Sequence, residues 1–496
     1  MVTTPAAGAD SVVAADGRAS ADRSLVMFVF NDCRRDARVL REATSLAGAG
    51  WRVTIMARPS DLNATQTETE RVGATTIVRV PVPGAWRSWW LAFRNPVRAR
   101  GFLSTQVKAA LTKGPSGWLW LVRVGLLGLV GLPFLALRLL ISLPGRLRGQ
   151  GPPPGGSLVD WLFRWRFSTL TWARAAGDVA PEALVYHGHD LTGLPAARRA
   201  WERHGGHLVY DSHEIFLSSG SNADRPRLVR WWFARLERRW AADAAALVTV
   251  NQSLAQVLGS ALHAREVVVL HNTPARWNPP VHPEDLLRAA AGLAPATPVA
   301  LYHGSFTIHR GIEELAEALL QPGMAAVHAV LLGYGQLRPT LVALASEPRF
   351  GGRLHVLDAV SPDELPAWVA TADVGVLPIR RSTQNHWLST PNKLFEALAV
   401  GVPVVASDFP EMRRIVVDDP LGPLGVLCDP DDPASIARGI LAIVEADPAA
   451  RADLRSRCLR AAHERWNWET EVARLIDLYG RLASAPPPGP ASGTTA

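Results

Sequence analysis

Residues 390–408 read TPNKLFEALAVGVPVVASD and predict a short helix followed by a buried strand. Pro391 suits the first turn of a helix, and Gly401 suits its end. The apolar run 402–406 is typical of a strand in a parallel sheet. The free N–H groups at a helix start attract anions, Lys393 adds a full charge, and Glu396 could reach the hydroxyls of a ribose. The stretch therefore predicts a nucleotide-sugar site.

A simpler interpretation is an ordinary helix–strand unit with a surface pair between Lys393 and Glu396, three positions apart. The use of lysine speaks against it. The chain has 52 Lys and Arg residues, of which only Lys108, Lys113 and Lys393 are lysines. A chain that otherwise uses arginine therefore has a lysine at the predicted anion site.

The order Pro391-x-Lys393-x-x-Glu396 resembles the donor motif of family 4 glycosyltransferases. This family has the GT-B fold, in which two Rossmann-like domains face each other across a cleft. Many members carry a second Glu eight positions earlier, where this chain has Leu388. The resemblance extends over residues 24–83 and 178–483. It implies a retaining, metal-independent, hexosyltransferase-like enzyme that uses a nucleotide diphosphate sugar.

A second donor element is expected at residues 301–311, which read LYHGSFTIHRG. Gly304 permits close approach of the backbone to a ligand, and Arg310 can bind phosphate oxygens with two parallel hydrogen bonds. The family usually has Arg after the first Gly and Lys before the second, where this chain has Ser305 and Arg310. A solvated surface cation is the alternative for Arg310. The donor-binding residues implied by the resemblance are Gly304, Ser305, Arg310, Asn392, Lys393, Leu394 and Glu396.

The acceptor is expected on the first domain. Residues 31–38 (NDCRRDAR) follow the first predicted strand, at the sheet edge where open α/β folds bind ligands. A helix cap by Asp36 is the alternative there. Residues 187–190 (HGHD) match a position where family members have a histidine near the reacting sugar, which favours His189, with His187 as the competing choice. A core or capping histidine is the alternative. The predicted catalytic residues are His189, Arg310 and Lys393, and the predicted acceptor-side residues are Asp32, Arg38, His187, Asp190, His213 and Glu214.

Alternating strands and helices over the 496 residues predict two α/β domains. The expected division is a disordered tail at 1–23, an acceptor domain at 24–282, a linker at 283–297, a nucleotide-sugar domain at 298–466, a C-terminal helix at 467–484 and a disordered tail at 485–496. The expected strands are 25–30, 52–57, 75–80, 183–187, 207–210, 247–250 and 267–270, then 299–302, 329–332, 354–357, 374–377 and 402–406.

Residues 86–174 interrupt this alternation. They contain thirteen basic residues and one acidic residue, a net +12 in a chain of net charge +7, and eight of its 18 tryptophans. Their apolar run 124–137 is shorter than the roughly 20 residues of a spanning helix. Tryptophan mixed with arginine is typical of a membrane-interface element, and a buried helix with arginine caps is the alternative for 159–174. We therefore expect a peripheral protein on the inner face of the cell membrane, with an anionic membrane surface as partner.

Other classes of protein are disfavoured. Cys33, Cys428 and Cys458 suggest neither a disulfide framework nor a zinc site, and the N-terminus does not resemble a signal peptide. Gly333-x-Gly335 fails as a dinucleotide fingerprint because Arg338 occupies the third glycine position. Asp429-x-Asp431 is interpreted as a helix cap, so no metal and no cofactor beyond the donor are expected.

The basic, aromatic stretch accompanies no nucleic-acid module, so no nucleic acid is expected as partner. A carbohydrate or lipid-linked acceptor, as in polysaccharide or glycolipid biosynthesis, is expected instead. A nucleotide-sugar epimerase of the same fold and a catalytically silent membrane-bound partner protein remain alternatives.

Overall fold

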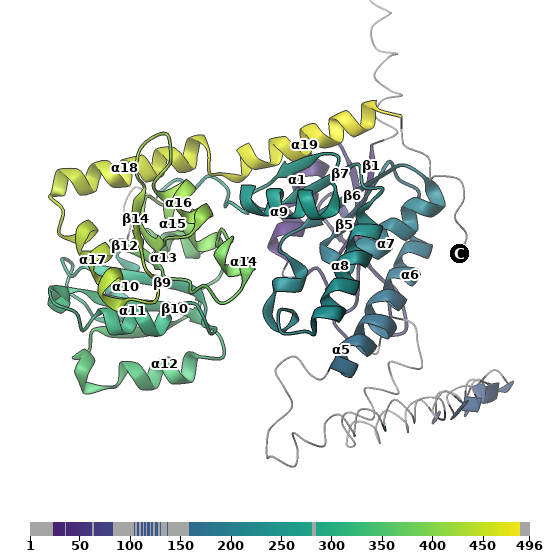
Figure 1. The fold of residues 1–496 in the computed structure, drawn as a ribbon, viewed down its shortest axis with the longest axis horizontal. Coiled ribbons are helices and arrows are strands. Elements are labelled where there is room, and N and C mark those ends of the chain that lie inside the picture. The colour runs from purple at the N-terminus through teal and green to yellow at the C-terminus, as the bar shows by residue number, and fades with distance from the viewer. Residues whose placement is uncertain are drawn as a thin grey trace, which may run out of the picture.

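The computed structural model describes residues 23–34, 36–61, 64–82, 158–279 and 284–486, with scattered residues between 104 and 136. These residues form two α/β units, each built on a largely or wholly parallel sheet (Figure 1). The prediction of a GT-B fold with two Rossmann-like domains is confirmed. Neither described unit contains a helix long and apolar enough to cross a membrane.

The first domain has a sheet in the order β3-β4-β2-β1-β5-β6-β7-β8. Only β3 runs antiparallel to its neighbour. The strands are β1 (Ser24–Phe28), β2 (Arg52–Ala57), β3 (Glu68–Val72), β4 (Thr75–Arg79), β5 (Val185–His189), β6 (His207–Ser212), β7 (Ala246–Thr249) and β8 (Val267–Val269). The helices are α1 (Ala37–Gly48), α5 (Leu158–Arg164), α6 (Leu170–Val179), α7 (Asp190–His204), α8 (Arg227–Ala241) and α9 (Gln252–Leu262).

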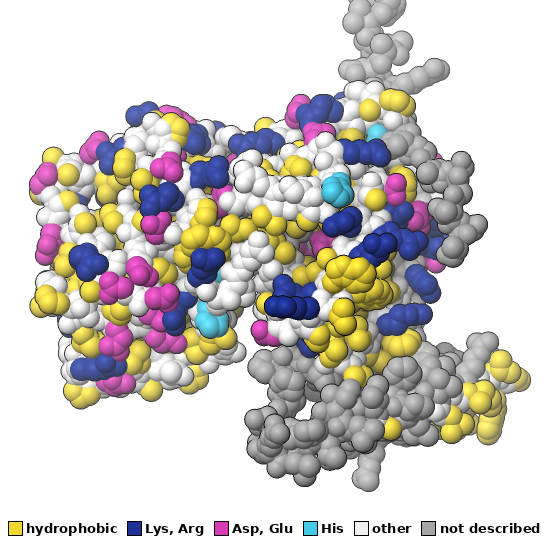
Figure 2. All heavy atoms as spheres, viewed as in Figure 1, with side chains coloured by type: hydrophobic (Ala, Val, Ile, Leu, Met, Phe, Trp, Pro, Cys, Tyr) yellow, Lys and Arg dark blue, Asp and Glu magenta, His cyan; other side chains and the backbone are white. Residues whose placement is uncertain are grey.

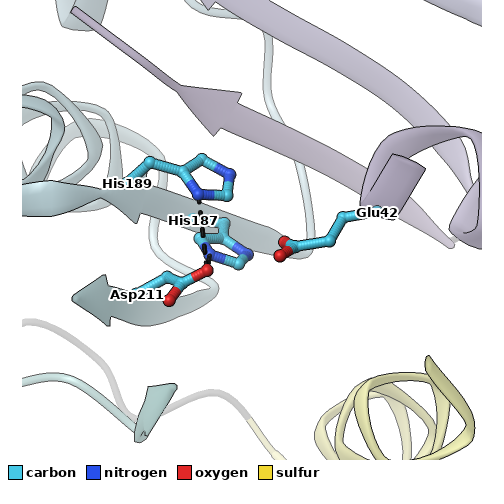
Figure 3. Close-up of side chains that lie close together, drawn as sticks. All are labelled: Glu42, His187, His189 and Asp211. Atoms are coloured by element: carbon cyan, nitrogen blue, oxygen red, sulfur yellow. Dashed lines mark ion pairs between the residues drawn. The ribbon is translucent and has the colours of Figure 1, made fainter. Parts of the chain in front are cut away.

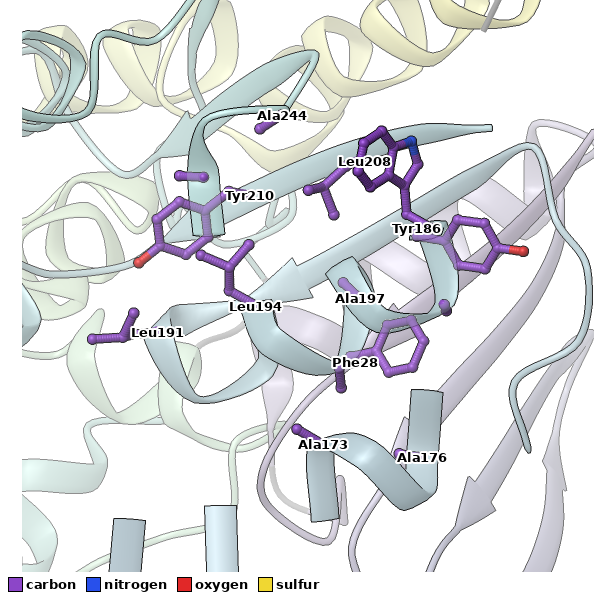
Figure 4. Close-up of a cluster of buried hydrophobic side chains, with 14 of the residues drawn as sticks. Phe28, Ala173, Ala176, Tyr186, Leu191, Leu194, Ala197, Leu208, Tyr210 and Ala244 are labelled. Atoms are coloured by element: carbon purple, nitrogen blue, oxygen red, sulfur yellow. The ribbon is translucent and has the colours of Figure 1, made fainter. Parts of the chain in front are cut away.

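Alternate residues of β1 serve two cores, as the two-residue period of a strand requires. Val26 and Phe28 point into a cluster with side chains of α6, α7 and α8, part of which Figure 4 shows. Leu25 and Met27 point to the other face, which α1 and the C-terminal helix cover. Covering both faces explains why the central strands are apolar runs.

The second domain has a six-stranded parallel sheet in the order β11-β10-β9-β12-β13-β14. Its strands are β9 (Val299–Ser305), β10 (His328–Tyr334), β11 (Leu354–Asp358), β12 (Val374–Leu377), β13 (Val404–Ser407) and β14 (Gly425–Cys428). Its helices are α10 (Leu286–Ala291), α11 (Ile312–Ala318), α12 (Arg338–Ala345), α13 (Leu365–Val369), α14 (Gln384–Trp387), α15 (Asn392–Ala399), α16 (Pro410–Val416), α17 (Pro433–Val444) and α18 (Pro448–Glu464). Helix α10 lies inside the predicted linker.

Helix α19 (Trp468–Ser484) returns from the second domain to the first (Figure 1). Trp468 donates a hydrogen bond from Nε1 to Oγ of Ser45 at 2.8 Å. Tyr479 is fully buried against Trp51, with ring centroids 5.3 Å apart. Helix α19 is therefore part of the first domain's core.

Each predicted strand overlaps an observed one, but β3 and β14 were not predicted. The five residues of β3 are exposed and mostly polar, so they lack the apolar signal of a buried strand. The Asp-x-Asp prediction also needs a correction in detail. Asp432, rather than Asp429 or Asp431, caps α17 by accepting from the N–H of Ala434 at 2.9 Å.

The predicted membrane element needs a larger correction. Residues 158–174 are helical, but Trp161, Trp165 and Trp172 are only 8%, 6% and 0% exposed. Trp161 packs on Phe233 of α8 with ring centroids 4.5 Å apart. The prediction that these three tryptophans sit among lipid headgroups is wrong, because the rings of Trp161 and Trp165 pack on Phe233 of α8 and that of Trp172 packs on Phe30. Apart from scattered positions, the rest of the predicted insertion lies outside the described residues, as do nearly all of the two predicted tails.

Candidate active site

Lys393 lies in the first turn of α15, where the sequence places it. Its Nζ is 3.6 Å from the centroid of the Tyr302 ring. Gly304 has a φ of 106°, and a Cβ built on it would lie 3.6 Å from Nζ of Lys393. Burial lowers the pKa of Lys393 well below its usual value and Arg310 adds to the shift, while Glu396 opposes it. Lys393 has no carboxylate contact among the described residues, so its charge is balanced mainly by an aromatic face.

Arg310 lies in the loop between β9 and α11. Its Nε is 3.4 Å from Oγ1 of Thr307, and the described residues offer its guanidinium no ion pair. Burial lowers the pKa of the nearby His386 to about 4, and the charge of Arg310 contributes. The loop is fixed by Gly311, which has a φ of 70° and no room for a Cβ, since that atom would lie 1.9 Å from the carbonyl oxygen of Pro378. Arg310 and Lys393 are thus two neighbouring basic groups, and neither makes an ion pair with the described residues.

Glu396 lies one turn after Lys393 and contacts His303 of β9, with Oε2 and Nε2 2.9 Å apart. The glutamate side chain is 31% exposed, while His303 is 4% exposed. One carboxylate oxygen is therefore held and the other remains open to a hydroxyl. Neither His303 nor Tyr302 was predicted to have a role in the site. Their position at a strand end just before Gly304 was the available signal.

The remaining predicted donor residues are Asn392, Ser305 and Leu394. Asn392 faces the first domain and accepts a hydrogen bond at Oδ1 from Nδ2 of Asn272 at 3.0 Å. The carbonyl oxygen of Ser305 accepts from the Tyr302 hydroxyl at 2.9 Å. Leu394 is buried in the core, and its N–H already donates to the carbonyl of Pro391. Donor binding by Leu394 stays a prediction that requires this hydrogen bond to open.

A pocket of about 610 Å³ lies between the two domains. It is lined by Asn31, Asp32, Asp36, Ala37, Arg38, His213, Val250 and Asn272 of the first domain and Thr390 and Asn392 of the second. Asn251 ties the domains together beside it, donating from Nδ2 to the carbonyl of Leu388 at 2.7 Å. Leu388, at the family's first glutamate position, is 8% exposed and packs in the first domain's core. The predicted loop 31–38 and the start of α15 therefore meet in one cleft.

Two members of that loop are held firmly. The Asp32 carboxylate accepts from the Ser60 hydroxyl, which lowers the pKa of Asp32, and its carbonyl accepts from Nε of Arg79 at 2.8 Å. Asp36 caps α1 by accepting from the N–H of Val39 at 3.2 Å. The alternative interpretation of Asp36 as a cap is confirmed, and Asp36 lines the pocket as well.

Beneath the pocket lies a buried charged cluster from α1, β5 and β6 (Figure 3). Arg38 contacts Glu42 at 2.9 Å, from Nε to Oε1, and Asp211 at 3.3 Å, from Nη2 to Oδ2. Nδ1 of His189 and Nε2 of His187 lie 3.4 and 3.6 Å from the same Asp211 oxygen. Burial opposes ionisation of Asp211, but Arg38 and His213 hold the pKa of this carboxyl well below its usual value. The cluster thus pairs its own charges.

The two predicted histidines differ from expectation in that both are fully buried. His187 hydrogen-bonds through Nδ1 to the Tyr479 hydroxyl of α19, and burial lowers its pKa to about 4. Its acceptor-side role stays a prediction, because its ring is buried and packs toward α19. His189 stacks on His187 with ring centroids 4.2 Å apart. Its catalytic role stays a prediction, since the described structure does not expose it to the pocket.

His213 is the histidine that reaches the pocket. Its ring is 5.5 Å from that of His189, and it contacts Asp190 and Asp211 at 3.5 and 3.2 Å. Burial opposes its charge, but these two carboxylates raise the pKa of His213 well above its usual value. Glu214 is exposed and does not line the pocket. The first-domain wall therefore presents an imidazolium backed by carboxylates.

Glu42, His187, His189 and Asp211 are the described residues whose spacing could suit a metal ion, with ligand atoms within 4.8 Å of one another. Arg38 already contacts both carboxylates of this set. A metal ion would have to share those carboxylates with a guanidinium, which favours a charge-paired cluster over a metal centre.

Comparison with known proteins relates parts of the chain to glycosyltransferases. Residues 297–446 match the family described as "Glycosyl transferases group 1". The chain is 33% identical over 220 residues to a D-inositol 3-phosphate glycosyltransferase of Xylanimonas cellulosilytica, covering 42% of this chain and 50% of that protein. It is 31% identical over 167 residues to a phosphatidyl-myo-inositol mannosyltransferase of Mycobacterium tuberculosis, covering 32% of this chain and 40% of that protein. The matches thus span about half the length of these relatives or less.

Solved structures show the fold over nearly the whole chain. Sucrose-phosphate synthase from Thermosynechococcus elongatus superposes with a TM-score of 0.64 at 16% identity, covering 93% of this chain and 99% of that one. An alpha,alpha-trehalose-phosphate synthase (UDP-forming) from Burkholderia vietnamiensis gives 0.59 at 14% identity, covering 94% and 100%. The chain therefore has the GT-B fold, and its second domain carries the sequence pattern of group 1 glycosyltransferases.

Proposed function

We propose that the protein transfers a sugar from a nucleotide diphosphate sugar to an acceptor hydroxyl in the interdomain pocket. The observation that carries this proposal is the cation pair of Lys393 and Arg310. Neither has a carboxylate contact in the described structure, and burial depresses the pKa of Lys393. A charge held in that way needs an anion, and a diphosphate would supply it at the start of α15.

The chemistry follows from this placement. The bond between the anomeric carbon and the diphosphate oxygen breaks, and the negative charge that develops on the leaving oxygen is stabilised by Arg310, Lys393 and the N–H groups of α15. The acceptor oxygen bonds to the anomeric carbon, and its proton passes to the departing phosphate. Attack from the face that the diphosphate leaves would give retention, as the family resemblance implies. Glu396, fixed by His303, would accept hydrogen bonds from the ribose hydroxyls.

The acceptor would approach from the first domain. His213 offers a charged donor to the pocket, and Asp32 offers a carboxylate that accepts from the Ser60 hydroxyl, while its backbone carbonyl accepts from Arg79. The ring of His189 lies 5.5 Å from that of His213 and is fully buried, so His189 would reach the sugar only if neighbouring side chains moved. We expect no metal ion in this mechanism, since the two cations supply the charge that a metal would.

A lipid-linked or membrane-bound glycan acceptor is the class we favour, with the protein held on the inner face of the cell membrane. The name of the mycobacterial relative, a phosphatidyl-myo-inositol mannosyltransferase, is consistent with such a substrate. The strongly basic segment between β4 and α5 supports the same choice through its charge.

The test is a thermal-shift screen of nucleotide diphosphate sugars, followed by product analysis with the best binder. A ligand at a hundred times its Kd raises the free energy of unfolding by about 2.7 kcal/mol. Slow donor hydrolysis without acceptor and transfer with one would support the proposal. Interconversion of the donor without an acceptor would indicate an epimerase. Binding without turnover, or no binding, would indicate a catalytically silent protein in which Leu388 and Ser305 replace needed groups.

A further inference from the structure

We infer that the outer face of α8, with an arginine-lined pocket beside it, docks onto an anionic lipid bilayer. This surface lies in the described first domain and is separate from the donor site. Docking through this surface does not require the transferase chemistry. The tryptophans of α5 and α6 are buried and cannot contact a membrane, so α8 takes the place that the sequence prediction gave to them.

Helix α8 has two distinct faces. Phe233, Glu237 and Ala241 point inward and are buried. Leu228, Trp231, Trp232, Arg235 and Arg239 follow the spacing i, i+3, i+4, i+7 and i+11, which places them on one outer face. The three apolar members are 81%, 63% and 46% exposed. Two neighbouring tryptophans exposed to this extent are unusual for a face that meets only water.

The apolar and basic residues are arranged in sequence along the helix. Leu228 and the two tryptophans occupy the first two turns, and the arginines follow. Figure 2 shows hydrophobic side chains gathered over the position of α8, with basic side chains around them. Tryptophan prefers the headgroup region, and arginine can pair with lipid phosphates at the same depth. A single outer face therefore offers both interactions of an interfacial helix.

The pocket beside α8 adds an arginine-lined site. It measures about 490 Å³ between α6, α7 and α8, and its charged residues are Arg166, Arg174, Arg198, Arg199, Arg239 and Glu202. Arg198 pairs with Glu202 and Asp243, and Arg199 pairs with Asp178. Within the described parts of the chain, Arg166, Arg174 and Arg239 make no ion pair. Three unneutralised guanidinium groups around one pocket suit a lipid phosphate.

The charge of the neighbouring chain segment favours lipid over a cover from the protein itself. Residues 83–157 contain ten basic and no acidic residues. That segment enters α5, whose Trp161 packs on Phe233 of α8. It could not neutralise the arginines of α8, whereas both would be drawn to the same anionic surface. Nucleic acid would also attract the arginines, but its phosphates would leave Leu228 and the tryptophans without an apolar partner.

Vesicle flotation of the full chain tests this inference. The vesicles are phosphatidylcholine with or without phosphatidylglycerol. The first variant is Trp231→Ser with Trp232→Ser, and the second is Arg235→Gln with Arg239→Gln. The matched control is Val342→Ser with Arg460→Gln, which removes one exposed apolar and one exposed basic residue of the second domain.

The two lost arginine charges should lower partition into anionic vesicles roughly thirtyfold, at about fivefold for each charge near the surface. The tryptophan variant should lose binding that persists in high salt, and the control should float like the parent.

A fluorescent probe provides an independent readout. The native cysteines are buried at 1%, 2% and 0% exposure, so Trp232→Cys introduces one accessible thiol. An environment-sensitive label there should shift to shorter wavelength with anionic vesicles and should not respond to single-stranded nucleic acid.

Several outcomes would overturn the inference. The inference fails if both α8 variants float as well as the parent, or if the parent does not float. It also fails if the label responds to nucleic acid and does not respond to vesicles. Nucleotide-sugar binding in solution is measured on the same variants and should be unchanged. A failure of donor binding in the parent would therefore count against the proposed function alone.

Discussion

Positive charge lies buried or half-buried on both sides of the cleft, and the two sides balance it differently. In the first domain Arg38 contacts Glu42 and Asp211, and His213 contacts Asp190 and Asp211. In the second domain Lys393 lies on the Tyr302 ring and Arg310 reaches one hydroxyl, with no carboxylate contact to either in the described structure. Paired charges of the first kind hold a fold together. Unpaired charges of the second kind destabilise the empty site and bind an anion when one arrives.

The largest expected effect tests the paired side. Asp211→Asn should lower the free energy of unfolding by about 3–5 kcal/mol, because the buried Arg38 and the half-buried His213 would lose the carboxylate that they share. Urea unfolding followed by circular dichroism measures the change.

Asp358→Asn is the matched control for this loss. Asp358 pairs with Arg338 but its side chain is 87% exposed, so the loss should stay below about 1 kcal/mol. Equal losses in the two variants would mean that the buried cluster contributes no more than a surface pair.

The unpaired side should behave in the opposite way. Lys393→Met should weaken donor affinity by about 1.5–3 kcal/mol, the range for a hydrogen bond to a charged group. The same change should raise the free energy of unfolding of the empty protein, because it removes a charge that burial disfavours. Calorimetric titration and urea unfolding measure the two quantities.

Arg381→Met is the control, since Arg381 also lies over an aromatic ring, that of Trp387 at 4.2 Å, but is exposed. Its donor affinity should match the parent. A destabilised Lys393→Met protein with unchanged affinity would assign Lys393 to the fold instead of the site.

A smaller effect is expected at the glutamate beside this pair. Glu396→Gln keeps the size of the side chain and a possible hydrogen bond to His303, but removes the charge. Donor affinity should fall by about 1 kcal/mol and activity should fall with it, while stability changes little. An unfolded variant whose activity per folded molecule is unchanged would show that Glu396 is structural.

The sequence predicted well what depends on local pattern. Apolar runs such as the one before Gly304 identified the central strands, and the helix that begins after Pro391 was placed to within a residue. Strand β3 was not predicted because all of its residues are exposed, and its pairing with β4 is not visible in the sequence. The contact of Glu396 with His303 joins positions 93 residues apart, which no local pattern reveals.

The tryptophans show a second limit. Trp161, Trp165 and Trp172 alternate with arginines as an interfacial helix would, yet their rings are buried in the core. Trp231 and Trp232 also lie among arginines in the sequence, and they are exposed. Composition alone could not separate these two cases, because burial depends on which face of the helix the rest of the domain covers.

Proton uptake on donor binding tests the central claim most directly. Because burial and Arg310 lower the pKa of Lys393 in the empty site, a diphosphate should raise it again. Binding should then take up a proton, and affinity should fall as the pH rises through the lowered pKa of the empty site toward the higher pKa of the complex. Calorimetry of the binding nucleotide sugar in buffers of different ionisation enthalpy measures this uptake. We predict uptake in the parent that disappears in Lys393→Met, whereas identical proton uptake in both proteins, or none in the parent across that pH range, would contradict the account.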